Sequence, residues 1–138
     1  MFSGIIAAAG TVLAAARAQG GARFRLAAPA PFLEDVLPGA SIAVNGACQT
    51  VETRDAGAFT FFSSAETLEK TNLKKWAAGA VCNLERALTL AAPLDGHLVT
   101  GHVDTVARVT AVERRGEGWF LSLALPDLIR HLVAEKGS

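Results

Sequence analysis

The feature that most limits the possible folds is an internal repeat with an offset of 97 residues. Both copies carry, in the same order, a glycine, an apolar extended run, a proline and a short helical pattern. The aligned pairs are Gly4 with Gly101, Ile6 with Val103, Val12 with Val109, Leu26 with Leu123 and Pro29 with Pro126. The identities are few and chance similarity is the alternative, but the preserved order argues against it.

The offset also predicts the domain organisation. Residues 1–96 are expected to form a first domain, and residues 97–138 the beginning of a second copy of it. At an offset of 97, residues 98–138 align with the first 41 residues of the chain, so the second copy is less than half complete. We therefore expect one whole small domain followed by part of another.

Turn signals divide the first copy into short extended runs. Asn45-Gly46 joins two such runs within residues 41–51, and this dipeptide favours a tight hairpin because both residues tolerate positive φ. Residues 58–62 are aromatic and β-prone, and residues 81–87 are typical of another strand. Many short strands predict an all-β fold, a small closed antiparallel barrel that leaves no open sheet edge.

Three short helices are expected at the turns. Residues 32–37 place four apolar side chains at i, i+1, i+4 and i+5, on one helical face. Residues 128–133 repeat this pattern with a slip of one residue. Ser63 and Glu66 have the spacing of a capping box, which predicts a third helix beginning at Ser63.

Charge and cysteine content exclude several classes of protein. Thirteen basic residues balance 13 acidic ones, which leaves no electrostatic footprint for nucleic acid or an anionic membrane. The two cysteines, Cys48 and Cys82, form no CxxC pair, so reduced thiols in the cytoplasm are expected rather than a disulfide or zinc site. The apolar residues 5–16 lack a preceding basic side chain, which argues against a signal peptide.

Four segments of the chain resemble the riboflavin synthase family, with consistent spacing from end to end. They are MFSGII at residues 1–6, SIAVNGACQTV at 41–51, ETLEKTNL with CNLERAL within 66–88, and GHLVTGHVD at 96–104. The resemblance implies two similar six-stranded antiparallel Greek-key barrels, of which the second is incomplete here. It also implies a homo-oligomer, a trimer in full-length members; for this chain we expect a dimer or an aggregate.

The activity that the resemblance implies is a transferase reaction of riboflavin biosynthesis. Two molecules of 6,7-dimethyl-8-ribityllumazine yield riboflavin and 5-amino-6-(ribitylamino)uracil, because one donates a four-carbon unit to the other. Neither a metal nor a redox cofactor takes part. The family also includes proteins that bind flavin or lumazine without turnover, which is the second interpretation of this chain. A structural barrel that binds no ligand is the third.

The resemblance further implies a set of site residues. His102, Cys48 and Ser41 are the candidates for catalysis. The candidates for substrate binding are Phe2, Gly4, Ile5, Ile6, Cys48, Gln49, Thr50, Phe62, Ser63, Ser64, Ala65, Glu66, Thr67, Gly101, His102, Val103 and Lys136. A pteridine edge carries amide-like donors and acceptors, which hydroxyls and backbone groups complement.

Simpler interpretations of the same residues remain. His102 alone would be an ordinary surface histidine, and Cys48 a small buried side chain. Phe2 packs either under a bound ring or in the core. His97, His102 and Asp104 fit no common zinc spacing.

Some positions depart from the family pattern. Gln49 stands where an apolar leucine is usual, Ser3 stands where threonine is usual, and residues 63–65 replace an apolar stretch. These departures leave the side-chain details of the pocket open.

Overall fold

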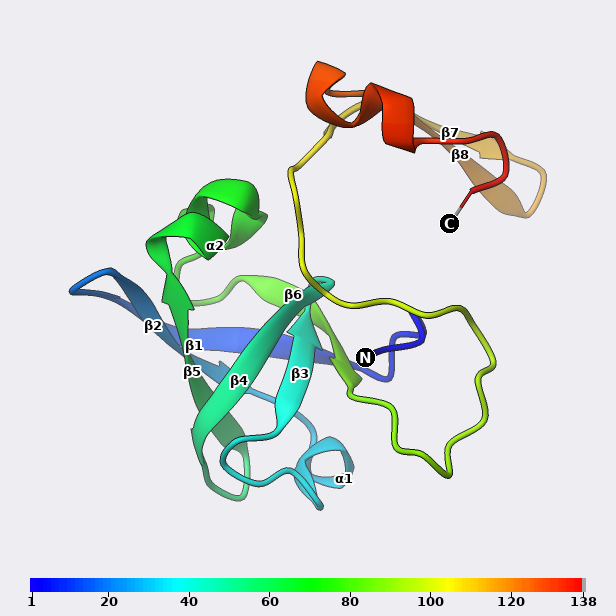
Figure 1. The fold of residues 1–138 in the computed structure, drawn as a ribbon. Helices are drawn as coiled ribbons and strands as arrows, with labels where there is room; N and C mark the ends of the chain where they lie inside the picture. Colours follow the sequence, from blue (N-terminus) through cyan, green and yellow to red (C-terminus); the bar gives the residue numbers. More distant parts are fainter. Residues whose placement is uncertain (138) are drawn as a thin grey trace. The chain divides into compact units, whose positions relative to one another are not determined.

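The computed structural model describes residues 1–137, whose contacts divide the chain into two compact units, Met1–Val103 and Asp104–Ser138. In the first unit, six antiparallel strands close into a barrel in the order β1-β2-β5-β4-β3-β6 (Figure 1). The strands are β1 Ala8–Ala18, β2 Gly21–Ala27, β3 Ser41–Val44, β4 Ala47–Arg54, β5 Ala58–Ser64 and β6 Val81–Arg86. The predicted all-β, six-stranded barrel is confirmed.

Alternating side chains give each strand an inner and an outer face. In β2, Ala22, Phe24 and Leu26 are buried, whereas Arg23 and Arg25 point outward. Because successive side chains of a strand point to opposite faces, every second side chain lies in the barrel interior. Phenylalanine, leucine and valine fill most of that interior. The Phe24 and Phe61 rings stack there with their centroids 5.3 Å apart.

The hairpin between β3 and β4 turns at Asn45 and Gly46, as the sequence predicts. Their φ angles are +47° and +81°, and Val44 pairs with Ala47 across the turn. The Asn45 side chain also accepts a hydrogen bond of 2.7 Å from the backbone N–H of Asn83. This turn therefore fixes the register of the β3–β4 pair and ties it to β6.

The predicted capping box is wrong by one residue. Strand β5 continues through Ser64, and the Ser63 side chain is buried. Helix α2 (Ala65–Lys70) has Ser64 as its N-cap, whose hydroxyl accepts from the Thr67 N–H at 3.2 Å. Glu66 forms an ion pair with Lys70 at 2.9 Å instead of bonding back to the cap. The strand alternation, which turns Ser63 inward, overrides the local capping pattern.

The other two predicted helices differ from their apolar patterns, one in length and one in helix type. Helix α1 spans Ala30–Leu33, and the buried Val36 lies beyond its end. A 3₁₀ helix, η1, follows α2 at Asn72–Lys75. In the second unit the pattern at residues 128–133 appears as the 3₁₀ helix η2 (Asp127–Leu132), which has no buried residue.

The second unit contains one hairpin, β7 (Arg108–Arg115) with β8 (Gly118–Ala124). Its pairing register repeats that of β1 with β2: Ala18 pairs with Gly21, and Arg115 pairs with Gly118. Both hairpins have a register shift, one between Val12 and Ala14 and the other between Val109 and Ala111, 97 residues later. The offset found in the sequence therefore recurs in the backbone pairing.

Along the chain, the boundary between the two compact units follows Val103, whereas the predicted second domain begins at residue 97. The domain limits of 1–96 and 97–138 concern sequence similarity and stay a prediction. Within residues 1–137, no helix has the length and apolar character needed to cross a membrane.

A buried polar pair inside the barrel generates a stability prediction. The Ser63 hydroxyl donates to Gln49 Oε1 at 2.7 Å, while Gln49 Nε2 has no partner among the described residues. Replacing Ser63 with alanine should lower the free energy of unfolding by about 1–2 kcal/mol, because it leaves a buried acceptor unpaired.

The double variant Gln49→Leu/Ser63→Ala should recover most of that loss, because it removes the whole polar pair. Urea denaturation followed by circular dichroism measures both effects. A double variant less stable than Ser63→Ala alone would contradict this account of the pair.

Candidate functional site

The outer face of β3 and β4 brings several predicted site residues together. Ile42 and Val44 in β3, and Ala47 and Val51 in β4, point into the core. The intervening Ser41, Cys48 and Thr50 therefore face outward, and Ser41 lies directly opposite Thr50 in the strand register. Ser41 and Cys48 are half-buried, and Thr50 is exposed. A thiol and two hydroxyls thus share one patch of the barrel surface.

Strand β5 extends this face. Phe59 and Phe61 belong to the core, so the half-buried Phe62 and the exposed Ser64 point outward. Ala65 and Glu66 are exposed on the first turn of α2, where Thr67 is half-buried. The outer face of β3–β5 therefore offers an aromatic ring beside several hydroxyls.

Gln49 and Ser63 point the other way. Both side chains are buried inside the barrel and bond to each other. Only their backbone groups belong to the outer face, although sequence comparison places them among the substrate-binding candidates.

Gly101 lies directly on this face. Its carbonyl accepts a hydrogen bond of 2.8 Å from the Cys48 N–H. A Cβ at Gly101 would come within 2.9 Å of the Cys48 Cβ and 3.0 Å of Phe2 Cε2. Its φ of +77° also suits glycine. The glycine is therefore required both by its backbone angle and by the close approach of two chain segments.

Phe2 supports Gly101 from the N-terminal end of the chain. Its backbone pairs with Val99 through two hydrogen bonds of 2.7 and 3.0 Å. The Phe2 ring is completely buried but does not belong to the cluster that fills the barrel interior. It thus packs on the outside of the barrel, beneath the segment that carries Gly101.

Glu85 lies beside Ser3 and the candidate site residue Gly4 of the N-terminal segment, and the sequence analysis did not single it out. Its carboxylate accepts from the Ser3 N–H at 2.6 Å, from the Ser3 hydroxyl at 2.8 Å and from the Gly4 N–H at 3.1 Å. The side chain points outward from β6, and the residue is only 6% exposed. The signal was present in the CNLERAL segment, where a carboxylate follows an inward-facing leucine.

The remaining candidates lie at other places. Gly4 faces His97 and Val99, and Ile5 and Ile6 are each 49% exposed. Two other residues continue from Gly101: His102 is exposed, and Val103 packs against the barrel core.

Lys136 belongs to the second unit, where its φ is +57°. The structure therefore places the candidate residues in a Cys48–Gly101 group and a Gly4–Ile6 segment of the first unit, with Lys136 in the second unit.

The two cysteines have different environments. Burial raises the pKa of the Cys82 thiol to about 11, and its sulfur lies 3.7 Å from the Gly10 carbonyl. Cys48 is half-buried on the outer face. Cys82 is therefore a core residue, and Cys48 is the accessible thiol. Within residues 1–137, no three His, Cys, Asp or Glu side chains gather as a metal site would require.

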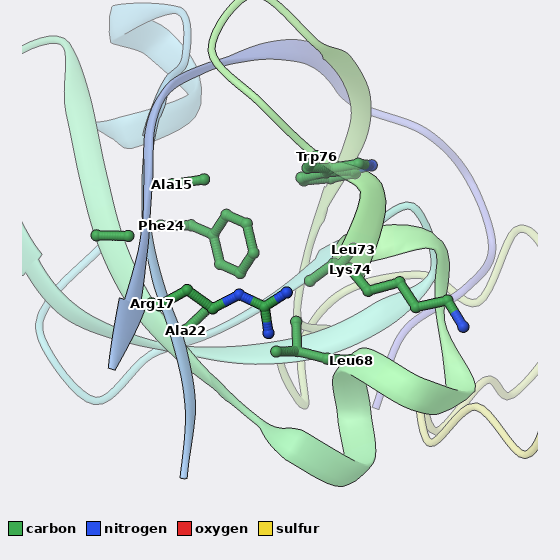
Figure 2. Close-up of a pocket in the computed structure, with 9 residues that line it drawn as sticks. Ala15, Arg17, Ala22, Phe24, Leu68, Leu73, Lys74 and Trp76 are labelled. Atoms are coloured by element: carbon green, nitrogen blue, oxygen red, sulfur yellow. The ribbon is translucent and has the colours of Figure 1, made fainter. Parts of the chain in front are cut away.

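The barrel also has pockets away from the Cys48 face. One of about 90 Å³ lies between β1 and the α2–η1 segment, where Phe24 meets Trp76 edge-to-face (Figure 2). Figure 2 shows the Arg17 side chain extending from β1 toward the middle of this pocket, in the direction of Leu73. Another pocket, of about 360 Å³, borders Ser3 and Glu85. Neither is lined by Cys48, Thr50 or Gly101.

Comparison with solved structures supports the fold. The chain is similar to LumP complexed with riboflavin, with a TM-score of 0.85, 23% identity, and coverage of 95% of this chain and 71% of that chain. It is also similar to LumP complexed with 6,7-dimethyl-8-(1'-D-ribityl) lumazine, with a TM-score of 0.83, 24% identity, and coverage of 92% of this chain and 70% of that chain. At these identities the likeness establishes the fold alone.

Comparison of sequences establishes the family. The family model of the lumazine binding domain matches residues 3–87. Riboflavin synthase of Bacillus subtilis (strain 168) is 39% identical over 100% of this chain and 64% of its own length. Riboflavin synthase of Mycobacterium tuberculosis (strain ATCC 25618 / H37Rv) is 38% identical over 100% of this chain and 69% of its own length. The chain thus spans about two thirds of its relatives and belongs to the riboflavin synthase family of lumazine-binding domain proteins.

Proposed function

We propose that the outer face of β3–β5, together with Gly101, binds the ring of 6,7-dimethyl-8-ribityllumazine, and that the chain is part of a riboflavin synthase. The contact between Cys48 and Gly101 carries the proposal. It brings the beginning of the second sequence copy onto the barrel of the first, through a hydrogen bond of 2.8 Å. Two motifs that are about fifty residues apart thereby share one surface.

The chemistry of this surface suits a flat heteroaromatic ring. Phe62 is half-buried and offers an aromatic side chain for packing against a ring. The hydroxyls of Ser41, Thr50 and Ser64 point outward and complement polar atoms at the ring edge or on the ribityl chain. Gly101 has no side chain, so its backbone packs closely against Cys48 and Phe2 and forms part of this surface.

The reaction in this proposal is a balanced exchange between two lumazines. One lumazine gives up a four-carbon unit to become 5-amino-6-(ribitylamino)uracil, and the other gains that unit to become riboflavin. Nothing is oxidised or reduced overall, and the proposal therefore requires no metal or redox cofactor. Holding two rings in the right orientation supplies much of the rate enhancement in a reaction of this kind.

Three side chains in or next to this face have suitable chemistry for the proton and nucleophile steps. Cys48 is an accessible thiol, and Ser41 offers a hydroxyl opposite Thr50. His102 is exposed immediately after Gly101, and its imidazole can accept a proton, as removal of a methyl proton requires. We assign these three residues the catalytic roles, and we assign Lys136 and residues 4–6 to further ligand contacts.

A second candidate function is ligand binding without turnover. It is favoured by the likeness of the fold to LumP, whose solved structures hold a lumazine, riboflavin or flavin mononucleotide. The Cys48–Gly101 surface serves this function equally well. Catalysis differs in needing two rings held together.

The proposed site predicts that Gly101→Ala weakens lumazine binding at least tenfold, because the new Cβ would meet Cys48 and Phe2. Gly20→Ala is the matched control. Gly20 has the same φ of +77°, but a Cβ there would meet nothing within 4 Å.

Titration of lumazine fluorescence measures both affinities. Equal affinities for the two variants would remove Gly101 from the site. Formation of riboflavin by the wild-type chain, followed by its absorbance, would separate the synthase from the non-catalytic binder.

Chemical labelling gives an independent prediction. Iodoacetamide should modify Cys48 well before Cys82, because Cys82 is buried and its pKa is raised to about 11. Saturating riboflavin should slow the labelling of Cys48 at least fivefold and leave Cys82 unchanged. Mass spectrometry of the two cysteine peptides provides the measurement, and Cys48 labelling unaffected by ligand would place the ligand elsewhere.

Self-association is expected from the second unit. Trp119, Leu121 and Leu123 on β8 are 66%, 56% and 56% exposed. Contiguous apolar surface of this kind favours protein–protein contact. The 138-residue chain should therefore run as a dimer or larger species in size-exclusion chromatography with light scattering, and a monomer at high micromolar concentration would contradict the expectation.

A further inference from the structure

The Glu85 side chain, near the end of β6, is held by hydrogen bonds that are not part of the strand pairing of the barrel. Its carboxylate accepts from the Ser3 N–H, the Ser3 hydroxyl and the Gly4 N–H, at 2.6, 2.8 and 3.1 Å. The residue is 6% exposed, and none of these partners belongs to a barrel strand. A buried carboxylate that has three donors is held firmly, and it holds its donors in turn.

The three donors belong to the segment that supports Gly101. Ser3 directly follows Phe2, whose backbone pairs with Val99 and whose ring lies against Gly101. The Ser3 carbonyl also accepts from the His97 N–H at 3.0 Å. The N-terminal segment is therefore bound on one side by Glu85 and on the other side by residues 97–99.

The packing of this segment leaves little freedom. A Cβ at Gly96 would collide with the Ser3 carbonyl. The Leu88 N–H donates to the Met1 carbonyl at 2.9 Å, just beyond the end of β6. A shift of the Ser3 backbone would thus move Phe2, and Phe2 would move Gly101 on Cys48.

We propose that Glu85 is a positioning residue that sets the place of Gly101 on the Cys48 face through Ser3 and Phe2. The inference rests on the proposed function for its link to lumazine. Glu85 touches no ligand in this scheme, because Ser3 and Gly4 take up its carboxylate. Its effect on binding passes through the hydrogen bond between the Cys48 N–H and the Gly101 carbonyl.

The test replaces Glu85 with glutamine in the full chain. Glutamine keeps the shape but is uncharged, so its oxygen accepts more weakly from the three donors, which all bond to Oε1. Its amide group replaces Oε2, which accepts from the Gly4 N–H at 3.2 Å. Glu113→Gln is the matched control, because Glu113 is an exposed carboxylate on β7, in the second unit, that pairs with Arg115 at 3.1 Å. Ser3→Ala is the milder variant, which removes one of the three donors and serves if Glu85→Gln does not fold.

Two readouts are compared, the dissociation constant for lumazine and the iodoacetamide labelling rates of both cysteines. We expect Glu85→Gln to raise the dissociation constant at least tenfold and to speed labelling of Cys48 at least tenfold, with Cys82 unchanged. Ser3→Ala should change both readouts in the same direction by about threefold to fivefold. Glu113→Gln should change neither readout.

Several results would overturn the inference. Unchanged Cys48 labelling would show that Glu85 does not hold the segment, and equal acceleration at both cysteines would reduce Glu85 to general stabilisation of the barrel. Faster Cys48 labelling with an unchanged dissociation constant would show that the position of Gly101 does not affect lumazine binding. A wild-type chain that binds neither lumazine nor riboflavin would refute the proposed function, while the labelling rates would still decide whether Glu85 positions Gly101.

Discussion

The hydrogen bond between the Cys48 N–H and the Gly101 carbonyl forms where the beginning of β4 is not paired with its neighbour β5. Strand β5 pairs with β4 only over Val51–Arg54, so the beginning of β4 has backbone groups that need another partner. Unpaired edges are costly and invite association, and here the partner is a segment that follows β6. Closure of this edge therefore depends on chain beyond the six strands. The candidate ligand surface forms at the same place.

The strand alternation divides the barrel into a core and a functional surface. Phe61 and Val51 fill the interior, while Phe62 and Thr50 on the same strands point outward. A slip of one residue would exchange these roles, so the register must be fixed before the surface can exist. The Asn45-Gly46 turn and its bond to Asn83 fix it for β3, β4 and β6. The same turn thus serves both stability and the arrangement of Cys48 with Thr50.

Features with a local physical cause could be predicted from the sequence. The Asn45-Gly46 hairpin follows from the two residues' tolerance of positive φ, and the offset of 97 residues recurs in the register of β7 with β8. The family resemblance correctly identified the barrel. Local patterns failed where long-range packing decides, as at Ser63, which a capping pattern assigned to a helix start and which β5 turns into the core. Glu85 was missed for the same reason, because its partners lie 81 and 82 residues away in the chain.

We propose that a lumazine ring lies on the outer face of β3–β5, against Gly101 and near Cys48. A crystal structure of the chain with bound 6,7-dimethyl-8-ribityllumazine tests it most directly. We expect the ring within van der Waals contact of Gly101 and Phe62, with an oxygen or nitrogen of the ring or the ribityl chain hydrogen-bonded to Thr50. A ring found instead in the pocket between Phe24 and Trp76, with the Cys48 face empty, would contradict it.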